Sequence, residues 1–179
     1  LVYDGEHVSM ASLLPDQTIL ISGLSKSHAM TGYRIGYVAG PAALMAHVGK
    51  MHQFLVTTAP GPMMAAAEEA LRNGRQDAID MRDTYKQRRD LVMAGLAEAG
   101  FTAAQPGGAF YIFAKIPAAL NTNDMEFVID LAETVKLGIA PGSIFGAGGE
   151  GYVRLSYAAS TEDLTEAVNR LKQYVALKG

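Results

Sequence analysis

The residues best suited to chemistry are a lysine and an arginine eight positions apart, Lys26 and Arg34. A lysine held near a second cation and partly shielded from water favours its neutral amine, which attacks aldehydes to form Schiff bases. The planar fork of an arginine matches phosphate. The pair could hold a phosphorylated aldehyde at both ends, with Ser22, Ser25 and Ser27 as hydroxyl donors. A non-covalent anion site for a phosphorylated metabolite is equally compatible with this spacing.

Two strands are predicted to position this pair. Residues 17–22 (QTILIS) form a short apolar run that Gly23 ends, and residues 33–39 (YRIGYVA) form a second run. Both are interpreted as buried strands because β-branched and apolar residues predominate. The stretch 23–32 between them is predicted as a loop that places Lys26 just past a strand end, where α/β proteins keep their sites.

Helical periodicity dominates the chain from Pro41 onward. Apolar residues recur at three- and four-residue spacing up to Leu55, residues 57–62 (TTAPGP) interrupt the pattern, and a second helix runs from about 63 to 71. A long helix is predicted from about 76 to 99. Its basic group is interpreted as a solvated face and consists of Lys86, Arg88 and Arg89.

After residue 99 the sequence pattern changes to shorter, alternating strand-like and helix-like segments, which predicts a small α/β unit. Strands are expected at 101–104, 109–116, 138–142 and 152–158, with a helix at 124–137 and a final amphipathic helix that begins near residue 160. Asn123 and Ser160 are candidate N-caps. We place the domain boundary near residues 73–80, so that residues 1–75 form one domain and residues 76–179 another.

Composition excludes several classes of protein. The chain has 179 residues, about half of them apolar, a formal net charge of -3 and no cysteine. Disulfide frameworks, thiolate metal sites and cysteine nucleophiles are therefore excluded, and His47 and His52 lack metal-ligand partners at matched spacing. We expect no nucleic-acid or membrane partner, no metal, and a soluble cytoplasmic protein.

The string at 22–37 (SGLSKSHAMTGYRIGY) resembles the cofactor-lysine signature of class I aminotransferases, S-K-x-x-x-M-T-G-(W/Y)-R-I-G-Y. Three more blocks follow in that family's order: PGGAFYIF at 106–113, APGSIFG at 140–146 and GYVRLSYA at 151–158. The resemblance implies the C-terminal half of a fold-type-I pyridoxal-phosphate-dependent aminotransferase. Its α/β fold would combine part of the cofactor-binding large domain, a mixed sheet with helices, with a small C-terminal α/β domain.

The same resemblance implies a role for each site residue. Lys26 would carry pyridoxal 5'-phosphate as a Schiff base and, once displaced by substrate, shuttle the proton at the substrate α-carbon. Arg34 would bind the cofactor phosphate, and Arg154 the substrate α-carboxylate, for which a guanidinium on a strand is a rigid clamp. Gly23 stands where many relatives carry a phosphate-binding serine, so Ser25 or Ser22 would supply that hydroxyl instead.

The chain opens without an initiator methionine, so we expect a piece of a longer protein. The family's pyridine-nitrogen aspartate, ring-stacking aromatic and other upstream cofactor contacts are not identifiable in it. The fragment alone is therefore expected to be nearly inactive, and its longer parent to be a homodimer acting on amino acids and 2-oxo acids. Two alternatives remain: a β-eliminating lyase on the same fold, and a non-enzymatic effector-binding domain of a transcription regulator. His28 is interpreted as a packing or solvent-facing histidine.

Overall fold

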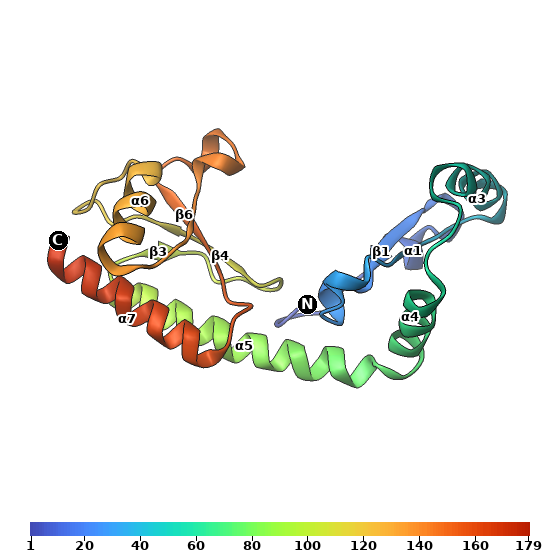
Figure 1. The fold of residues 1–179 in the computed structure, drawn as a ribbon, viewed down its shortest axis with the longest axis horizontal. Helices are drawn as coiled ribbons and strands as arrows, with labels where there is room; N and C mark the ends of the chain where they lie inside the picture. The colour runs from blue at the N-terminus through green and yellow to red at the C-terminus, as the bar shows by residue number, and fades with distance from the viewer. The chain divides into compact units, whose positions relative to one another are not determined.

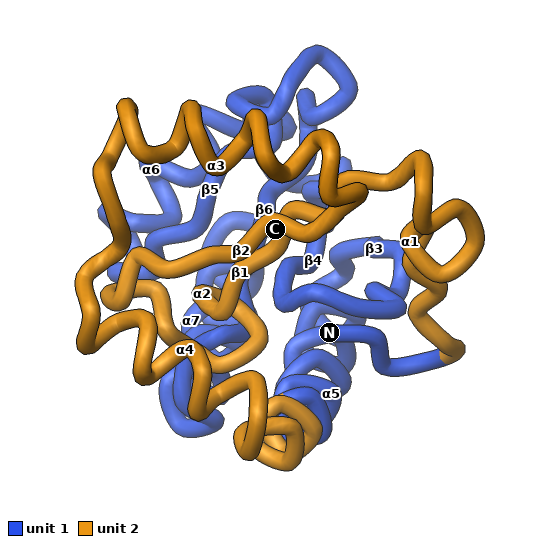
Figure 2. The backbone as a smooth tube through the Cα atoms, turned by 90° about the vertical axis from the view of Figure 1, so that its right-hand side faces the viewer, with its two compact units in different colours: residues 1–4, 82–179 blue, residues 5–81 orange.

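The computed structural model describes residues 1–179 and divides them into two compact units. Unit 1 comprises residues 1–4 and 82–179, and unit 2 comprises residues 5–81 (Figure 2). The chain is α/β, as the sequence predicts, because helices and short strands alternate in both units. The backbone passes from one unit to the other twice, once after Asp4 and once inside the long helix α5 (Arg75–Glu98).

Unit 2 is built on a two-stranded antiparallel sheet, β1 (Leu20–Gly23) with β2 (Gly36–Ala39), in which Gly23 lies opposite Gly36. Two short helical turns join the strands, and two longer helices follow them (Figure 1). Pro41 and Pro60 precede the two longer helices, where a proline costs no helical hydrogen bond. The helices of unit 2 are α1 (Met10–Leu13), η1 (Pro15–Gln17), α2 (Leu24–Ser27), η2 (Thr31–Tyr33), α3 (Ala42–Val56) and α4 (Gly61–Asn73).

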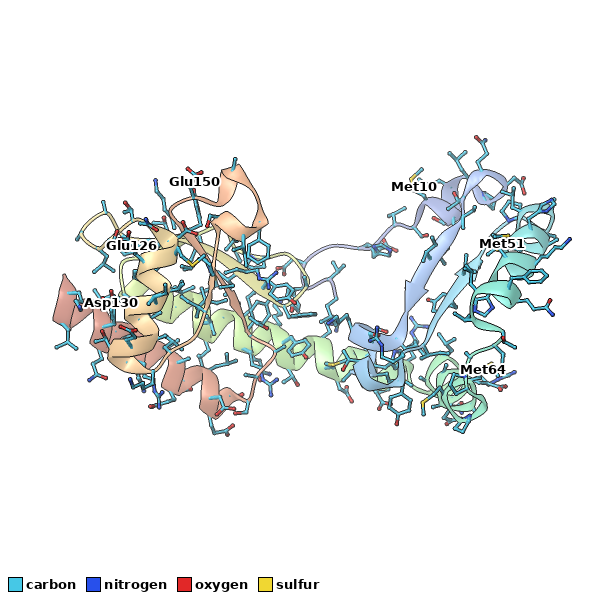
Figure 3. The ribbon with its side chains drawn as sticks, turned by 45° about the horizontal axis from the view of Figure 1, so that its top comes forward. Met10, Met51, Met64, Glu126, Asp130 and Glu150 are labelled. Atoms are coloured by element: carbon cyan, nitrogen blue, oxygen red, sulfur yellow. The ribbon has the colours of Figure 1, made fainter.

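Two expectations for unit 2 are corrected. The stretch predicted as a loop is largely helical, because α2 and η2 occupy most of it. The strands are not buried: Ile21 is 80% exposed, and every residue of β2 is exposed. A sheet of two strands buries apolar side chains only where further layers cover it. Unit 2 also exposes apolar side chains of its helices, among them Met51 on α3 and Met64 on α4 (Figure 3).

Unit 1 is a four-stranded antiparallel sheet in the order β3-β4-β6-β5. Within it α6 contacts α7, β5 and β6, and α7 runs alongside α5 (Figure 1). The strands are β3 (Thr102–Ala103), β4 (Tyr111–Lys115), β5 (Ala140–Pro141) and β6 (Tyr152–Ser156), and the helices are α6 (Asp124–Val135), η3 (Ser143–Phe145), η4 (Ala147–Gly149) and α7 (Thr161–Lys178). Both predicted caps are confirmed, since the side chain of Asn123 accepts from Glu126 N and that of Ser160 from Asp163 N.

The core of unit 1 follows from strand alternation. Ile112 and Ala114 of β4 and Val153 of β6 are fully buried, whereas Tyr111 and Phe113 on the opposite face of β4 are each 37% exposed. The buried side chains pack against apolar residues of the helices, which are Val92, Leu96, Phe127, Leu131, Leu171 and Tyr174. One face of the sheet is therefore closed by helices, and the other presents aromatic rings.

The prediction of a solvated basic face on α5 is wrong for Arg89, which is only 1% exposed. Its Nη1 donates to Asp4 Oδ2 at 3.2 Å and to the Pro106 carbonyl at 2.8 Å, and its Nε donates to Asp90 at 2.9 Å. The guanidinium also lies 4.9 Å from the centre of the Tyr3 ring. Residues 1–4 pack over α5 at this point. Because they are more than 80 positions away in the sequence, the helical periodicity around Arg89 gives no sign of this contact.

Candidate active site

Lys26 lies on α2, the single helical turn that follows β1. Gly23 is the N-cap of this turn in extended conformation, and Leu24 is buried at 2% exposure. The Leu24 carbonyl accepts from His28 N and from Met30 N, which closes the turn. Lys26 itself is exposed, so the shielding from water that we expected is absent from this chain. The amine of Lys26 therefore extends from a short helical turn whose buried residue, Leu24, lies two positions earlier.

The register of the sheet brings Arg34 to the same end of unit 2 as Lys26. Because Gly23 pairs with Gly36, the segment that leaves β1 and the segment that enters β2 lie together, and α2 contacts η2. Arg34 is the C-cap of η2 in left-handed conformation, with φ 51°. Its Nη1 donates to the Thr31 carbonyl at 2.9 Å, and the residue is exposed.

The backbone is tight where the two strands meet. A Cβ added at Gly36 would lie 2.9 Å from the Ser22 carbonyl oxygen, and one added at Gly23 would lie 3.2 Å from the Ile35 carbonyl oxygen. Glycine at both positions permits this close approach. A serine at position 23 would require the neighbouring backbone to shift by a few tenths of an ångström.

The donors at this end of unit 2 fit a phosphorylated aldehyde. A primary amine (Lys26) and a guanidinium (Arg34) are carried by neighbouring backbone segments, and two hydroxyls lie close to them in the chain, with Ser25 half-buried on α2 and Ser22 exposed on β1. The amine is the group that condenses with an aldehyde, and the guanidinium is the group that pairs with phosphate. The donor chemistry therefore suits pyridoxal phosphate.

Arg154 lies in unit 1, on β6 between β4 and β5, opposite Phe113 on one side and Ala140 on the other. Its guanidinium carbon is 4.3 Å from the centre of the Tyr111 ring and 4.1 Å from that of the Phe145 ring. Stacking on aromatic faces holds the guanidinium plane while its N–H edge can still bind an anion. None of the ion pairs within the chain involves Arg154.

A cavity of about 530 Å³ opens beside Arg154 within unit 1. Its walls are mostly apolar and include Ile139, Leu155 and Leu164, and its charged lining residues are Arg154 and Asp163.

Sequence reasoning did not single out the side chains that hold the turn before β4. Ala109 adopts a left-handed conformation, with φ 59°, and its carbonyl accepts hydrogen bonds from the hydroxyls of Tyr3 and Tyr157. Burial raises the pKa of both hydroxyls, which keeps them protonated as donors. These bonds fix the backbone two residues before Tyr111 and so help to place the ring that supports Arg154. The only local signal in the sequence was the glycine-rich turn itself.

No three side chains among His, Cys, Asp and Glu are grouped so as to hold a metal ion. His47 and His52 both lie on α3. None of the helices combines the length and the apolar composition that crossing a bilayer requires.

Lys26 on a turn after a strand and Arg34 at the same sheet end thus lie in unit 2, and the stacked Arg154 lies on the sheet of unit 1. Residues 2–171 match the family described as "Aminotransferase class I and II", and the chain belongs to this family. It is 44% identical over 178 residues to the probable N-acetyl-LL-diaminopimelate aminotransferase of Bacillus subtilis. This alignment covers 99% of this chain and 45% of that protein. It is 39% identical over 182 residues to the aspartate aminotransferase of Pyrococcus abyssi, covering 99% of this chain and 46% of that protein.

Solved structures agree with this assignment. The aromatic aminotransferase from Pyrococcus horikoshii superposes with a TM-score of 0.89 at 36% identity, over 98% of this chain and 48% of that chain. A Thermus thermophilus aspartate aminotransferase variant complexed with tryptophan gives 0.87 at 33% identity, over 96% of this chain and 45% of that one. The predicted fold type is thus confirmed. The chain spans a little under half the length of the relatives that it matches.

Proposed function

We propose that this chain is the lysine-bearing C-terminal half of a pyridoxal-phosphate-dependent aminotransferase. The observation that carries the proposal is that the segments carrying Lys26 and Arg34 lie together at one end of the β1–β2 sheet, inside the signature string that the chain shares with the family. When bound, pyridoxal phosphate supplies an aldehyde and an electron sink for amino-group chemistry. The reaction would transfer an amino group from an amino acid to a 2-oxo acid.

Each site residue has a defined task in this proposal. The Lys26 amine would hold the cofactor at its aldehyde and would move the proton at the substrate α-carbon. Arg34 pairs with the phosphate, helped by the hydroxyl of Ser25 or Ser22. Arg154 binds the substrate α-carboxylate through its planar fork, whose orientation the Tyr111 and Phe145 rings maintain.

The remaining half of the enzyme would supply the other cofactor contacts. The relatives are about twice as long as this chain, and an acidic partner for the cofactor ring nitrogen is part of pyridoxal chemistry. We therefore propose that the chain alone is nearly inactive and that its longer parent is a homodimer. The proposed domains, 1–75 and 76–179, meet at the first residues of α5.

The substrate is proposed only at the level of its class. The relatives carry names that include aspartate, aromatic and N-acetyl-diaminopimelate aminotransferases. Arg154 accounts for an α-carboxylate, which all amino acids share. The proposed substrates are therefore an amino acid and a 2-oxo acid.

Chemical trapping tests the proposal directly. The chain is incubated with pyridoxal phosphate and reduced with borohydride, and the modified peptide is identified by mass mapping. We expect the label mainly on Lys26 and its loss in Lys26→Ala, whereas Lys50→Ala, which changes an exposed lysine on α3, retains it. Label spread evenly over the lysines, or absent from position 26 in both the chain and its longer parent, would contradict the proposal.

A further inference from the structure

His28 links the lysine turn to the far end of helix α4. The residue is half-buried and is the C-cap of α2. Its Nδ1 lies 2.9 Å from Ser27 Oγ, and its Nε2 lies 3.1 Å from the carbonyl oxygen of Gly74, 46 positions further along the chain. The imidazole therefore spans from the residue next to Lys26 to a separate helix.

The two contacts define one arrangement of protons. A carbonyl oxygen only accepts, so Nε2 must carry the hydrogen that is donated to Gly74. In the neutral ring Nδ1 is then an acceptor, and the Ser27 hydroxyl donates to it. Both ring nitrogens are thus satisfied by partners of opposite character, and a rotated or flipped ring would lose both bonds.

The C-terminal end of helix α4 supports the lysine turn at His28. Gly74 is the C-cap of α4, and a Cβ added there would lie 3.2 Å from His28 Cδ2, so the ring packs directly on this glycine. On the other side of Lys26, the buried Leu24 shares the wall of a cavity of about 300 Å³ with Ala67 of α4 and its apolar neighbours. Lys26 lies two residues before His28 and two residues after the buried Leu24.

We propose that His28 is a positioning residue for Lys26. Its bonds to Ser27 and Gly74 hold the α2 turn on the C-terminal end of α4, so that the amine emerges from a fixed backbone. A group aligned in this way reacts faster because less conformational freedom is lost on reaction. The inference rests on the proposed role of Lys26 as the cofactor lysine.

A purely structural role makes a different prediction. The Gly74 carbonyl at the end of α4 accepts from Ala78 N at 3.4 Å, and His28 adds a second hydrogen bond to it. If capping were its only task, substitution would lower the stability of unit 2 and leave the reactivity of Lys26, measured relative to other lysines, unchanged. Relative labelling separates the two roles because Lys50 and Lys115 serve as internal references in the same sample.

The experiment compares variants of the chain after borohydride trapping of pyridoxal phosphate. In His28→Ala, we expect the label on Lys26 relative to Lys50 and Lys115 to fall about tenfold, and in Ser27→Ala about threefold. His28→Gln keeps a donor at the Nε2 position and should stay within about twofold of the original chain. His47→Ala removes an exposed histidine on α3 and is the matched control. An unchanged ratio in His28→Ala, or an equal fall in His28→Gln, would overturn the proposal.

A second measurement does not depend on the cofactor. Amide hydrogen exchange of residues 26–30 should accelerate about tenfold in His28→Ala and not in His47→Ala, because the turn opens locally when its attachment is lost. Equal exchange in both variants would refute the positioning role. If the original chain traps no cofactor on Lys26 while exchange responds as expected, the attachment is established and the proposed function is what fails.

Discussion

The packing of α5 on α7 depends on a missing side chain at Gly95. This residue is buried within α5, and a Cβ added there would lie 2.3 Å from Val168 Cγ1 and 2.8 Å from Cγ2 on α7. Contacts that short force a shift of the helix or of the valine. Gly95→Ala therefore tests whether the two helices are in direct contact beneath the sheet that carries Arg154.

The expected magnitude is a balance of two terms. Overpacking a core position costs about 1–3 kcal/mol, and replacing a helical glycine with alanine returns roughly 1 kcal/mol. Gly95→Ala should therefore lower the free energy of unfolding by roughly 0–2 kcal/mol. Val168→Ala alone removes two methyl groups from a nearly buried side chain and should cost about 2 kcal/mol.

The double variant gives the decisive result. With both changes the new methyl group occupies space that the valine vacated, so the clash disappears and the helix-propensity gain remains. We expect a favourable coupling of about 2 kcal/mol between the two sites. Urea unfolding followed by circular dichroism measures all four proteins of the cycle.

Gly49→Ala is the matched control, because Gly49 lies within α3 and an added Cβ would meet nothing within 4 Å. It should show the propensity gain alone, about 0.5–1 kcal/mol. If Gly95→Ala stabilised the chain as much as Gly49→Ala, or if the two substitutions at the α5–α7 contact were additive, the inferred contact would be refuted.

Two further predictions concern a buried tyrosine and the carboxylate site. Tyr174 donates to Asp130 Oδ2 at 2.6 Å, and burial, followed by the hydrogen bond to Asp130, raises its pKa from 10.0 to about 12. Because the folded state holds this proton more tightly, its contribution to stability is complete below pH 10 and is lost as the pH rises to about 12. Melting temperatures should fall over this interval, and fall less in Tyr174→Phe. In the longer parent, Arg154→Lys should raise the KM for the amino donor about tenfold or more, because the ammonium keeps the charge and loses the fork. An unchanged KM would remove Arg154 from the carboxylate site.

Local sequence patterns predicted most of the helices and strands, because helices and their caps depend on residues that are close together in the chain. The apolar spacing up to Leu55 and the long periodic stretch after residue 75 correspond to α3 and α5. Asn123 and Ser160 mark the starts of α6 and α7, because each side chain accepts a hydrogen bond from the backbone N–H three residues later. Such interactions span a few residues, so a single sequence contains all the partners that they need.

Burial was predicted less well because it depends on what lies across from an element. The β1 and β2 sequences have the apolar composition of interior strands, yet β2 and the two middle residues of β1 are exposed in this chain, which spans under half the length of its relatives. Arg89 shows the converse error. Its charge suggests solvent, but Asp4 and the Pro106 carbonyl, which are remote in the chain, surround it.

In the candidate site, too, the residues paired by local sequence were predicted and those held by distant partners were not. Lys26 and Arg34 are separated by only eight positions, and the register of one strand pair suffices to bring their segments together, so the motif and the geometry point to the same pair. The residues that hold the site residues in place come from elsewhere in the chain. Phe145 stacks on Arg154 from a separate helical turn, and the Gly74 carbonyl accepts a hydrogen bond from His28, 46 positions away. Residues that react can be recognised by their chemistry, whereas residues that hold them in place are ordinary in type and become apparent only when the fold shows what they touch.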